Sequence, residues 1–242
     1  MNEHDSDTIP GSLDEARRGA RKRLIQVLVI LILMMALLFA SAGDIRWPMG
    51  WLYFGIYLLA KIISSALLMR KSPEVLAERS QIKAGSQSWD KLPALIVGLV
   101  GPLAMLLVAG LDRRFGWSPQ LAFHTLIGAS IFVALGCAIG GWAINCNKFF
   151  SAVVRIQSER DHSVASDGPY GIVRHPGYTG MAIYMVAAPL MLGSIWGLIP
   201  AGLTILVLIY RTAREDRFLH AKLDGYRDYA GRTRHRLLPG IW

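Results

Sequence analysis

Charged side chains are missing from long stretches of this sequence. Of its 242 residues 18% are charged, and five apolar runs together hold only one of the 43 charged side chains. Each run can cross a hydrocarbon core about 30 Å thick, so a soluble globular protein is excluded. The runs also lack the apolar-polar alternation of barrel strands, which disfavours a membrane β-barrel. The five runs are 24–43, 47–69, 92–111, 121–146 and 177–210.

Cysteines and nucleotide motifs are also scarce. The two cysteines, Cys137 and Cys146, are nine positions apart on one predicted helix. Their Cα atoms should therefore lie about 13 Å apart, too far to form a disulfide with each other. There is no zinc-ligand spacing, no G-x-G-x-x-G or Walker motif and no internal repeat. We therefore expect free thiols, no metal site, and no dinucleotide or P-loop fold.

The apolar runs predict an all-α polytopic membrane protein. Each of the first four runs has the length of one span. The fifth has 34 residues, or about 51 Å as a single helix, and carries the helix breakers Pro189, Gly193 and Pro200 in its middle. It therefore predicts a helical hairpin, with arms 178–192 and 195–210 that either cross or re-enter. The expected fold is four spans plus this C-terminal hairpin, about six membrane helices.

The basic residues indicate an orientation. If the spans alternate, one side of the membrane receives 22 of the 26 Lys and Arg residues, the other side receives three, and Lys61 lies within a span. The positive-inside rule then places both termini in the cytoplasm of a multi-pass protein of the inner (cytoplasmic) membrane. The net charge of +9 is thereby explained without nucleic acid. The expected partners are membrane lipids and a lipophilic substrate.

Three regions are expected along the chain. Residues 1–23 are polar, with no apolar periodicity, and predict a disordered cytoplasmic tail. Residues 24–146 form the transmembrane helical region. Residues 147–242 combine a polar, helix-like stretch over 148–160, several turn motifs and the membrane hairpin within 178–210.

The most informative motif is R-H-P-G-Y-T-G, from Arg174 to Gly180, at the start of the hairpin. Pro176 biases His175 away from the helical region, and Gly177 leaves the backbone accessible. Such a corner can hold a small polar ligand at the membrane boundary. The alternative is an interfacial turn, with the basic side chains facing lipid headgroups and Tyr178 in the aromatic belt.

Two further features stand out, a pair of charged residues after the hairpin and a charge within a span. Arg211 and Glu215 follow the hairpin four residues apart, on one helical face, which is also the commonest arrangement of a surface ion pair. Lys61 shares a polar stripe with Tyr53 and Tyr57 on an otherwise apolar span. An intramembrane charge is costly unless it is paired or lines a cavity, so Lys61 either guides a substrate headgroup or snorkels to the interface.

Together these motifs resemble the isoprenylcysteine carboxyl methyltransferase family, whose C-terminal half is similar to that of phospholipid methyltransferases. The resemblance covers about 147–242 and looks like a bacterial-type member. It rests on G-P-Y, R-H-P-G-Y-T-G, the hairpin, Glu215-Asp216, and G-Y-x-x-Y before R-L-L-P. It implies an integral membrane enzyme that transfers a methyl group from S-adenosylmethionine to a lipophilic acceptor, through a cytoplasmic cofactor-binding region.

The resemblance also implies residue roles. Arg211 and Glu215 take the catalytic positions, and Arg211 would bind the substrate. Lys61 is a second candidate for substrate binding, from its intramembrane charge and not from the resemblance. The simplest alignment places Arg155 rather than Gln157 at a family glutamine, and both assignments stay open. Asp216 is expected to matter less than Glu215. The residues assigned to the cofactor are Gln157, His162, Ser163, Val164, Ala165, Tyr170, His175, Pro176, Gly177, Tyr178 and Glu215.

The chemistry suits such a site. A sulfonium methyl donor is already activated, so transfer to a carboxylate, the expected acceptor, or to a thiolate needs only in-line placement and exclusion of water. A free isoprenoid acid, a lipid headgroup and a small hydrophobic thiol all stay open as acceptors. One alternative is an NADPH-dependent membrane reductase of a sterol- or isoprenoid-like substrate, because such reductases are similar in their C-terminal architecture. A non-catalytic membrane assembly or transport protein is the third hypothesis.

Overall fold

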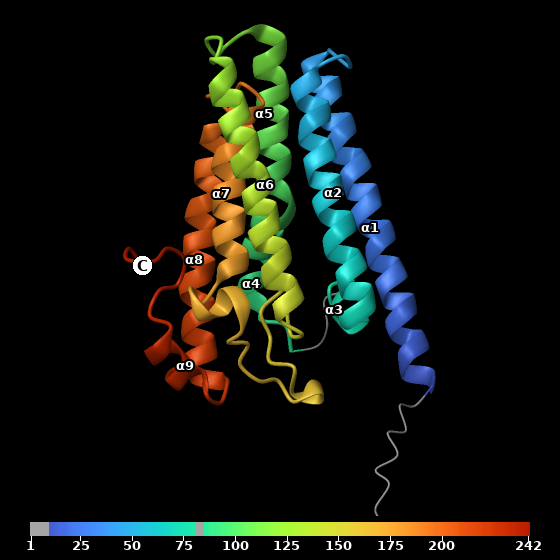
Figure 1. The fold of residues 1–242 in the computed structure, drawn as a ribbon, viewed down its shortest axis with the longest axis vertical. Helices are drawn as coiled ribbons and strands as arrows, with labels where there is room; N and C mark the ends of the chain where they lie inside the picture. Colours follow the sequence, from blue (N-terminus) through green and yellow to red (C-terminus); the bar gives the residue numbers. More distant parts are fainter. Residues whose placement is uncertain (1–9, 81–84) are drawn as a thin grey trace, which may run out of the picture.

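The computed structural model describes residues 10–80 and 85–242, and within these ranges the protein is helical, without strands. Six long segments run along one bundle, and the continuous segment α4–η1–α5 counts as one of them (Figure 1). This confirms the expected all-α architecture. The α-helices are α1 (Pro10–Ala42), α2 (Pro48–Lys71), α3 (Pro73–Glu78), α4 (Ser88–Leu95), α5 (Gly101–Phe115), α6 (Phe123–Cys146), α7 (Pro176–Met191), α8 (Leu198–Lys222) and α9 (Tyr226–Arg232).

Four segments are long and apolar enough to cross a membrane: Arg18–Ala42, Pro48–Lys71, Ser88–Phe115 and Phe123–Cys146. Large apolar side chains on these segments remain exposed, among them Leu28, Ile62 and Phe132. Exposed apolar surface of this extent fits a lipid environment. The chain is therefore a polytopic membrane protein, and the four expected spans are confirmed.

The third span is one continuous helical segment with an irregular centre. A π-helical turn, η1 (Ile96–Val100), joins α4 to α5, and prolines lie on both sides of it. Proline removes a backbone donor, and a π-turn is one way in which a helix absorbs such an interruption. A Cβ atom on Gly101 would lie 2.2 Å from the Thr204 hydroxyl oxygen. Glycine is thus required here because α8 packs directly on this turn.

The predicted hairpin is present as α7 and α8. A hydroxyl anchors its turn to the end of α5, because the Ser194 Oγ donates to Asp112 at 2.5 Å. Gly193 has φ +74, which favours glycine. The arms differ from the expected boundaries, because α8 has no breaker after Tyr210 and continues to Lys222. Neither arm is among the four candidate spans, and α7 is about 24 Å long at 1.5 Å per residue.

The hairpin packs on α6 through two glycines. A Cβ atom on Gly136 would lie 2.7 Å from the Gly180 carbonyl oxygen, and one on Gly180 would lie 2.6 Å from the Gly136 oxygen. Small residues at such positions let two membrane helices pack backbone against backbone. This close contact holds the start of α7, and with it the His175 corner, against the end of α6.

The expected tail over residues 1–23 is in part helical. The first helix begins at Pro10, and residues 1–9 lie outside the described residues. Ala20 is fully buried, and a Cβ atom on Gly19 would lie 2.7 Å from the Ala77 Cβ, so this part of α1 packs against α3. The end of the expected tail is therefore ordered by packing against α3, a contact that the sequence of the tail does not predict.

The helix-like stretch expected over 148–160 is a loop, with a 3₁₀ turn only at Ser158–Arg160. Its backbone groups bond to distant residues instead: the Val154 amide donates to Asp90, and the Val154 carbonyl accepts from Gln87. Long-range partners thus replace the helical hydrogen bonds. The two cysteines are free thiols, as expected.

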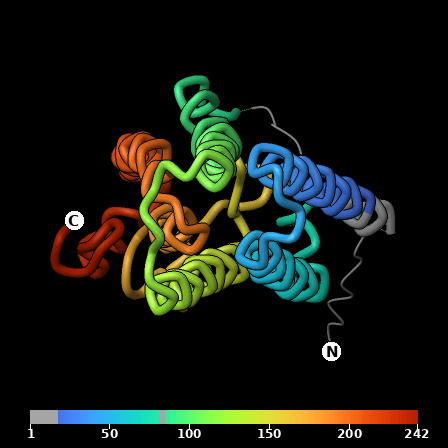
Figure 2. Tube along the Cα trace, turned by 90° about the horizontal axis from the view of Figure 1, so that it is seen from above, coloured from blue at the N-terminus to red at the C-terminus, as the bar shows by residue number. Residues whose placement is uncertain are grey.

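The four segments that hold 22 of the 26 Lys and Arg residues meet at one end of the bundle. The start of α1, the α2–α3 junction, the loop after α6 and the end of α8 all lie at the lower end in Figure 1. Figure 2 shows α1 and α2 on one side of the bundle and α7 and α8 on the other. This arrangement agrees with an even number of passes, while the cytoplasmic orientation stays a prediction.

Candidate functional site

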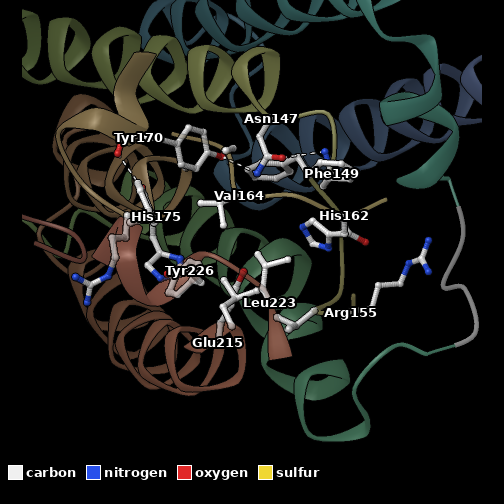
Figure 3. A pocket seen from close by; sticks show the side chains of 18 of the residues that line it. Asn147, Phe149, Arg155, His162, Val164, Tyr170, His175, Glu215, Leu223 and Tyr226 are labelled. Atoms are coloured by element: carbon white, nitrogen blue, oxygen red, sulfur yellow. Dashed lines mark hydrogen bonds between the residues drawn. The ribbon is translucent and has the colours of Figure 1, made fainter. Parts of the chain in front are cut away.

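A cavity opens at the basic end of the bundle, between the loop after α6, the start of α7, the end of α8 and α9. It has a volume of about 790 Å³, part of which is open to solvent. Figure 3 shows His175, Tyr226 and Glu215 on one side of this cavity and His162 and Phe149 on another. We call it the candidate cavity. The predicted site residues that line it are His162, Ser163, Val164, Ala165, Tyr170, His175, Gly177, Tyr178, Arg211 and Glu215.

Three predicted residues do not line the cavity. Pro176 is the first residue of α7. The Gln157 side chain is fully buried, donates to the Phe149 carbonyl at 2.6 Å and accepts from Arg160 at 2.8 Å. Lys61 lies in α2, with its Nζ 5.0 Å from the centroid of the Tyr57 ring. The structure thus gives Gln157 and Lys61 local partners, and neither residue lines the cavity.

Arg155, the alternative to Gln157, does line the cavity. Its guanidinium points to one side, where Nε and Nη2 donate to the Glu78 carboxylate at 2.8 and 3.0 Å. A second acid, Glu159, accepts from Nη2 at 2.5 Å. Arg155 therefore presents its side chain to the cavity, while its charge is compensated by acids outside it.

The His175 corner has the geometry that its sequence predicts. His175 has φ −126 and ψ 61, outside the helical region, and Pro176 then begins the helix. The His175 and Tyr178 rings are stacked, with centroids 5.7 Å apart. A Cβ atom on Gly177 would lie 3.1 Å from the Phe150 ring, so a glycine lets this ring pack against the turn. The motif thus presents two aromatic rings and an open backbone to one cavity.

Glu215 lines the same cavity from α8. It accepts a hydrogen bond from the Tyr178 hydroxyl at 2.5 Å. Within the described part of the chain, no Lys, Arg or His forms an ion pair with it. A half-buried carboxylate with a hydroxyl partner and no basic partner provides a negative charge that a cationic ligand can neutralise.

Arg211 is held by a partner that the sequence does not indicate. Its Nε and Nη2 donate to the two Asp90 carboxylate oxygens at 2.7 and 2.9 Å, and Nη2 also donates to the Ala152 carbonyl at 2.9 Å. The guanidinium carbon lies 5.2 Å from the centroid of the Tyr178 ring. Arg211 thus pairs with Asp90, 121 positions away, and not with Glu215 on its own helix.

Asp216, which the sequence ranks below Glu215, is the centre of a buried network. It is 0% exposed and accepts from Arg174 Nε at 2.8 Å, Arg236 Nε at 2.8 Å and the Tyr226 hydroxyl at 3.0 Å. Burial by itself raises the pKa of Asp216, but hydrogen bonds from His175, Arg174 and Arg236 outweigh it and hold the pKa far below its usual range. Asp216 therefore joins the His175 corner, α9 and the C-terminal segment.

His162 has a specified state in this site. Its Nδ1 accepts from the Gln157 backbone amide at 3.2 Å, and its ring packs on the Phe149 ring, with centroids 4.4 Å apart. Burial, together with Arg155 and Arg160, lowers the pKa of His162 to about 4. The imidazole is thus neutral at neutral pH, and its Nε2 can donate a hydrogen bond toward the cavity.

Aromatic and apolar side chains that the sequence analysis missed complete the lining. The Asn147 amide donates to the Tyr170 hydroxyl at 3.3 Å, and the Tyr229 hydroxyl donates to the Tyr170 carbonyl at 2.8 Å. The G-P-Y and G-Y-x-x-Y motifs therefore meet in space. The tyrosines that both motifs carry were the feature of the sequence from which this contact could have been predicted. The missed lining residues include Asn147, Phe149, Leu219, Leu223, Tyr226 and Tyr229.

Comparisons with known proteins match this part of the chain. Residues 123–224 match the family model described as "Phospholipid methyltransferase". A probable protein-S-isoprenylcysteine O-methyltransferase from Oryza sativa subsp. indica is 35% identical over 63 residues, which cover 26% of this chain and 33% of that protein. The protein-S-isoprenylcysteine O-methyltransferase from Schizosaccharomyces pombe is 33% identical over 64 residues, which cover 26% of this chain and 27% of that protein.

The matches therefore span about a third or less of these curated relatives. The matched segment contains the end of α6, the cavity loop, the His175 corner and Glu215. The match overlaps the region of the resemblance over 147–224, whereas G-Y-x-x-Y and R-L-L-P lie beyond its end. Over residues 123–224 the chain is thus similar to phospholipid methyltransferases, and over a shorter stretch it is similar to isoprenylcysteine methyltransferases.

Proposed function

We propose that this protein is an integral membrane methyltransferase that uses S-adenosylmethionine and acts on a lipophilic acceptor, with a carboxylate as the acceptor group. The observation that carries the proposal is the charge balance of the candidate cavity. Its three buried arginines, Arg155, Arg174 and Arg211, each pair with an acid that does not line the cavity. Glu215 is left as the uncompensated charge, so the cavity suits a cation.

S-adenosylmethionine fits this charge pattern, because it carries a sulfonium and an amino group. When bound, it supplies an activated methyl group that needs no strong base. Glu215 would hold one of its cationic or hydroxyl groups, and the loop 162–165 would close over it. His175, Gly177 and Tyr178 would contact it from the start of α7, with Tyr170 opposite.

Arg211 is proposed to orient the acceptor rather than the cofactor. Two of its nitrogens are occupied by Asp90 and Ala152, so its remaining nitrogen, Nη1, is available to an anionic group. Because Asp90 fixes the guanidinium, that nitrogen has a defined direction. The structure supports no such role for Lys61, which does not line the cavity.

A binding experiment distinguishes this proposal from a reductase. Calorimetry on the purified full-length chain should show binding of S-adenosylmethionine and of its demethylated product, and none of NADPH. NADPH would bring several negative charges to a cavity whose unpaired charge is Glu215. Binding of NADPH without S-adenosylmethionine would overturn the proposal in favour of the reductase. Binding of neither would favour a non-catalytic role.

We also propose that the cavity faces the cytoplasm of a cell whose inner membrane holds the protein. This rests on the distribution of basic residues and supplies the cavity with a soluble cofactor. In a background with Cys137 and Cys146 replaced by alanine, Ala230→Cys in intact cells should resist an impermeant thiol reagent. Arg113→Cys, at the other end of the bundle, should react. The reverse pattern would invert the orientation.

A further inference from the structure

A second cavity lies beside the candidate cavity, between α1 and the end of α3. It encloses about 830 Å³, part of it open to solvent, and Arg23, Gln26, Arg79 and Ser80 contribute polar groups to its wall. The Arg79 guanidinium carbon lies 4.9 Å from the centroid of the Phe150 ring, and the same ring lines the candidate cavity. Phe150 therefore contacts Arg79 and lines the candidate cavity as well, while the two cavities share no lining residue.

Among the side chains that the structure describes, residues 18–80 and 85–242, the two arginines of this second cavity have no acidic partner. Arg23 and Arg79 form no ion pair there, whereas Arg155, Arg174 and Arg211 each have one. The Arg79 Nη1 atom is buried without a hydrogen-bond partner. Burial, followed by the charges of Arg23 and Arg211, lowers the pKa of Arg79 to about 10. Two adjacent cations without a counter-charge favour an anion from outside the chain.

Gln26, which lines the same cavity, has an unpaired acceptor. The Gln26 amide nitrogen donates to the Ser80 carbonyl at 3.0 Å, which leaves the Gln26 Oε1 buried and without a partner. A ligand that satisfies all three side chains must accept from the arginines and donate to Gln26. A carboxylate offers no donor, whereas a phosphate ester that carries a hydroxyl or amino group offers both.

The cavity lies at the membrane boundary. Arg23 is near the start of the first candidate span, Arg18–Ala42. Just beyond it, Ile25 and Val29 also line the cavity and are 62% and 48% exposed. An amphiphile can therefore place its headgroup at the arginines and its chains along α1, and basic pockets at this depth bind lipid headgroups.

We propose that this second cavity binds one membrane phospholipid, through its phosphate at Arg23 and Arg79 and a hydroxyl or amino group of its headgroup at Gln26. This lipid is distinct from the methyl acceptor, because the second cavity and the candidate cavity share no lining residue. Evidence against the lipid site would therefore leave the methyltransferase proposal unaffected, and evidence against the methyltransferase would leave the lipid site unaffected.

The test is native mass spectrometry of the full-length protein, delipidated in detergent and titrated with phosphatidylglycerol. One lipid should bind tightly to the wild type. Arg79→Gln and Arg23→Gln should each weaken this binding by about tenfold to a hundredfold, since each removes a charged hydrogen-bond partner. Arg79→Lys should restore part of it. Arg21→Gln, which removes an equal charge from an exposed position of the same helix, should leave it unchanged.

Two further ligands identify the source of the phosphate. Glycerol phosphate, which lacks chains, and oleate, which lacks a phosphate, should each bind at least about tenfold more weakly than the lipid. Equal binding of glycerol phosphate would make this a site for soluble phosphate esters, and equal binding of oleate would remove the phosphate requirement. Wild-type affinity in both Gln variants, or an equal loss in Arg21→Gln, would also overturn the proposal. A thermal unfolding midpoint near that of the wild type shows that each variant is folded.

Discussion

The two halves of the chain contribute differently to the candidate cavity. In the described part of the chain, every residue that lines it lies within 147–229, and helices α1 to α6 supply none. Yet Glu78 and Asp90, from this other half, neutralise Arg155 and Arg211. The C-terminal half thus builds the surface of the cavity, and the N-terminal half sets its charge. The family match accordingly covers most of the lining residues and leaves out Glu78 and Asp90.

The largest effect is expected inside the C-terminal half, at Asp216. Asp216→Ala leaves Arg174 and Arg236 without their shared acid, and breaking a buried ion pair costs about 3–5 kcal/mol. We expect a lower thermal unfolding midpoint, measured in detergent, and exposure of α9 and the C-terminal segment to protease. Asp228→Ala, on the exposed face of α9, is the matched control. A midpoint equal to that of the control would contradict the central position of Asp216.

The pair between the halves is tested by Asp90 and Arg211. Asp90→Leu alone should destabilise the protein by about 3–5 kcal/mol, because it leaves the buried Arg211 unpaired. Adding Arg211→Met should recover part of that loss, since no charge then remains unpaired. The stability of the two single variants and the double variant forms a double-mutant cycle. Strictly additive losses would show that the two residues are not coupled.

The charge of the cavity itself is tested by Glu215→Gln. This variant removes the uncompensated charge and keeps an acceptor for Tyr178, so the fold should persist. We expect about ten- to a hundredfold weaker binding of S-adenosylmethionine by calorimetry, from the loss of roughly 1.5–3 kcal/mol for a charged hydrogen bond. Asp224→Asn, an exposed acid near the same end of α8, should bind normally. Unchanged affinity in a folded Glu215→Gln protein would remove Glu215 from the cofactor site.

The smallest effect concerns His162. Its pKa is near 4 in the folded protein and 6.5 in a free side chain, so the unfolded chain binds the proton more tightly. The stability due to neutral His162 is therefore fully present above pH 6.5 and declines as the pH falls toward 4, by about 1 kcal/mol after allowance for its partial exposure. His162→Asn should show a smaller decline in unfolding midpoint over this range, and exposed His124→Asn should behave like the wild type. Identical pH profiles for the wild type and His162→Asn would contradict the lowered pKa.

Much of the architecture follows from local features of the sequence. The length and apolarity of each run predict the spans, since a membrane-crossing helix satisfies its backbone hydrogen bonds internally. Pro189, Gly193 and Pro200 predict the hairpin because proline and glycine favour helix ends. Gly193 lies in the turn, Pro189 in the last turn of α7 and Pro200 in the first turn of α8. The R-H-P-G-Y-T-G motif and Glu215 could also be predicted as part of the site, because the conformation of each depends on residues close to it in the sequence.

Only the tertiary structure decided which charges are compensated. Arg155 and Glu78 are 77 positions apart, and Arg211 and Asp90 are 121 apart. A buried charge is stable next to whichever opposite charge the fold brings to it, so sequence spacing carries no signal for such pairs. The same reason explains the loop over 148–160, whose backbone bonds to Asp90 and Gln87 rather than to itself. The sequence by itself determined the helices and the cavity motifs, and the packing of distant helices determined the charge that the cavity presents.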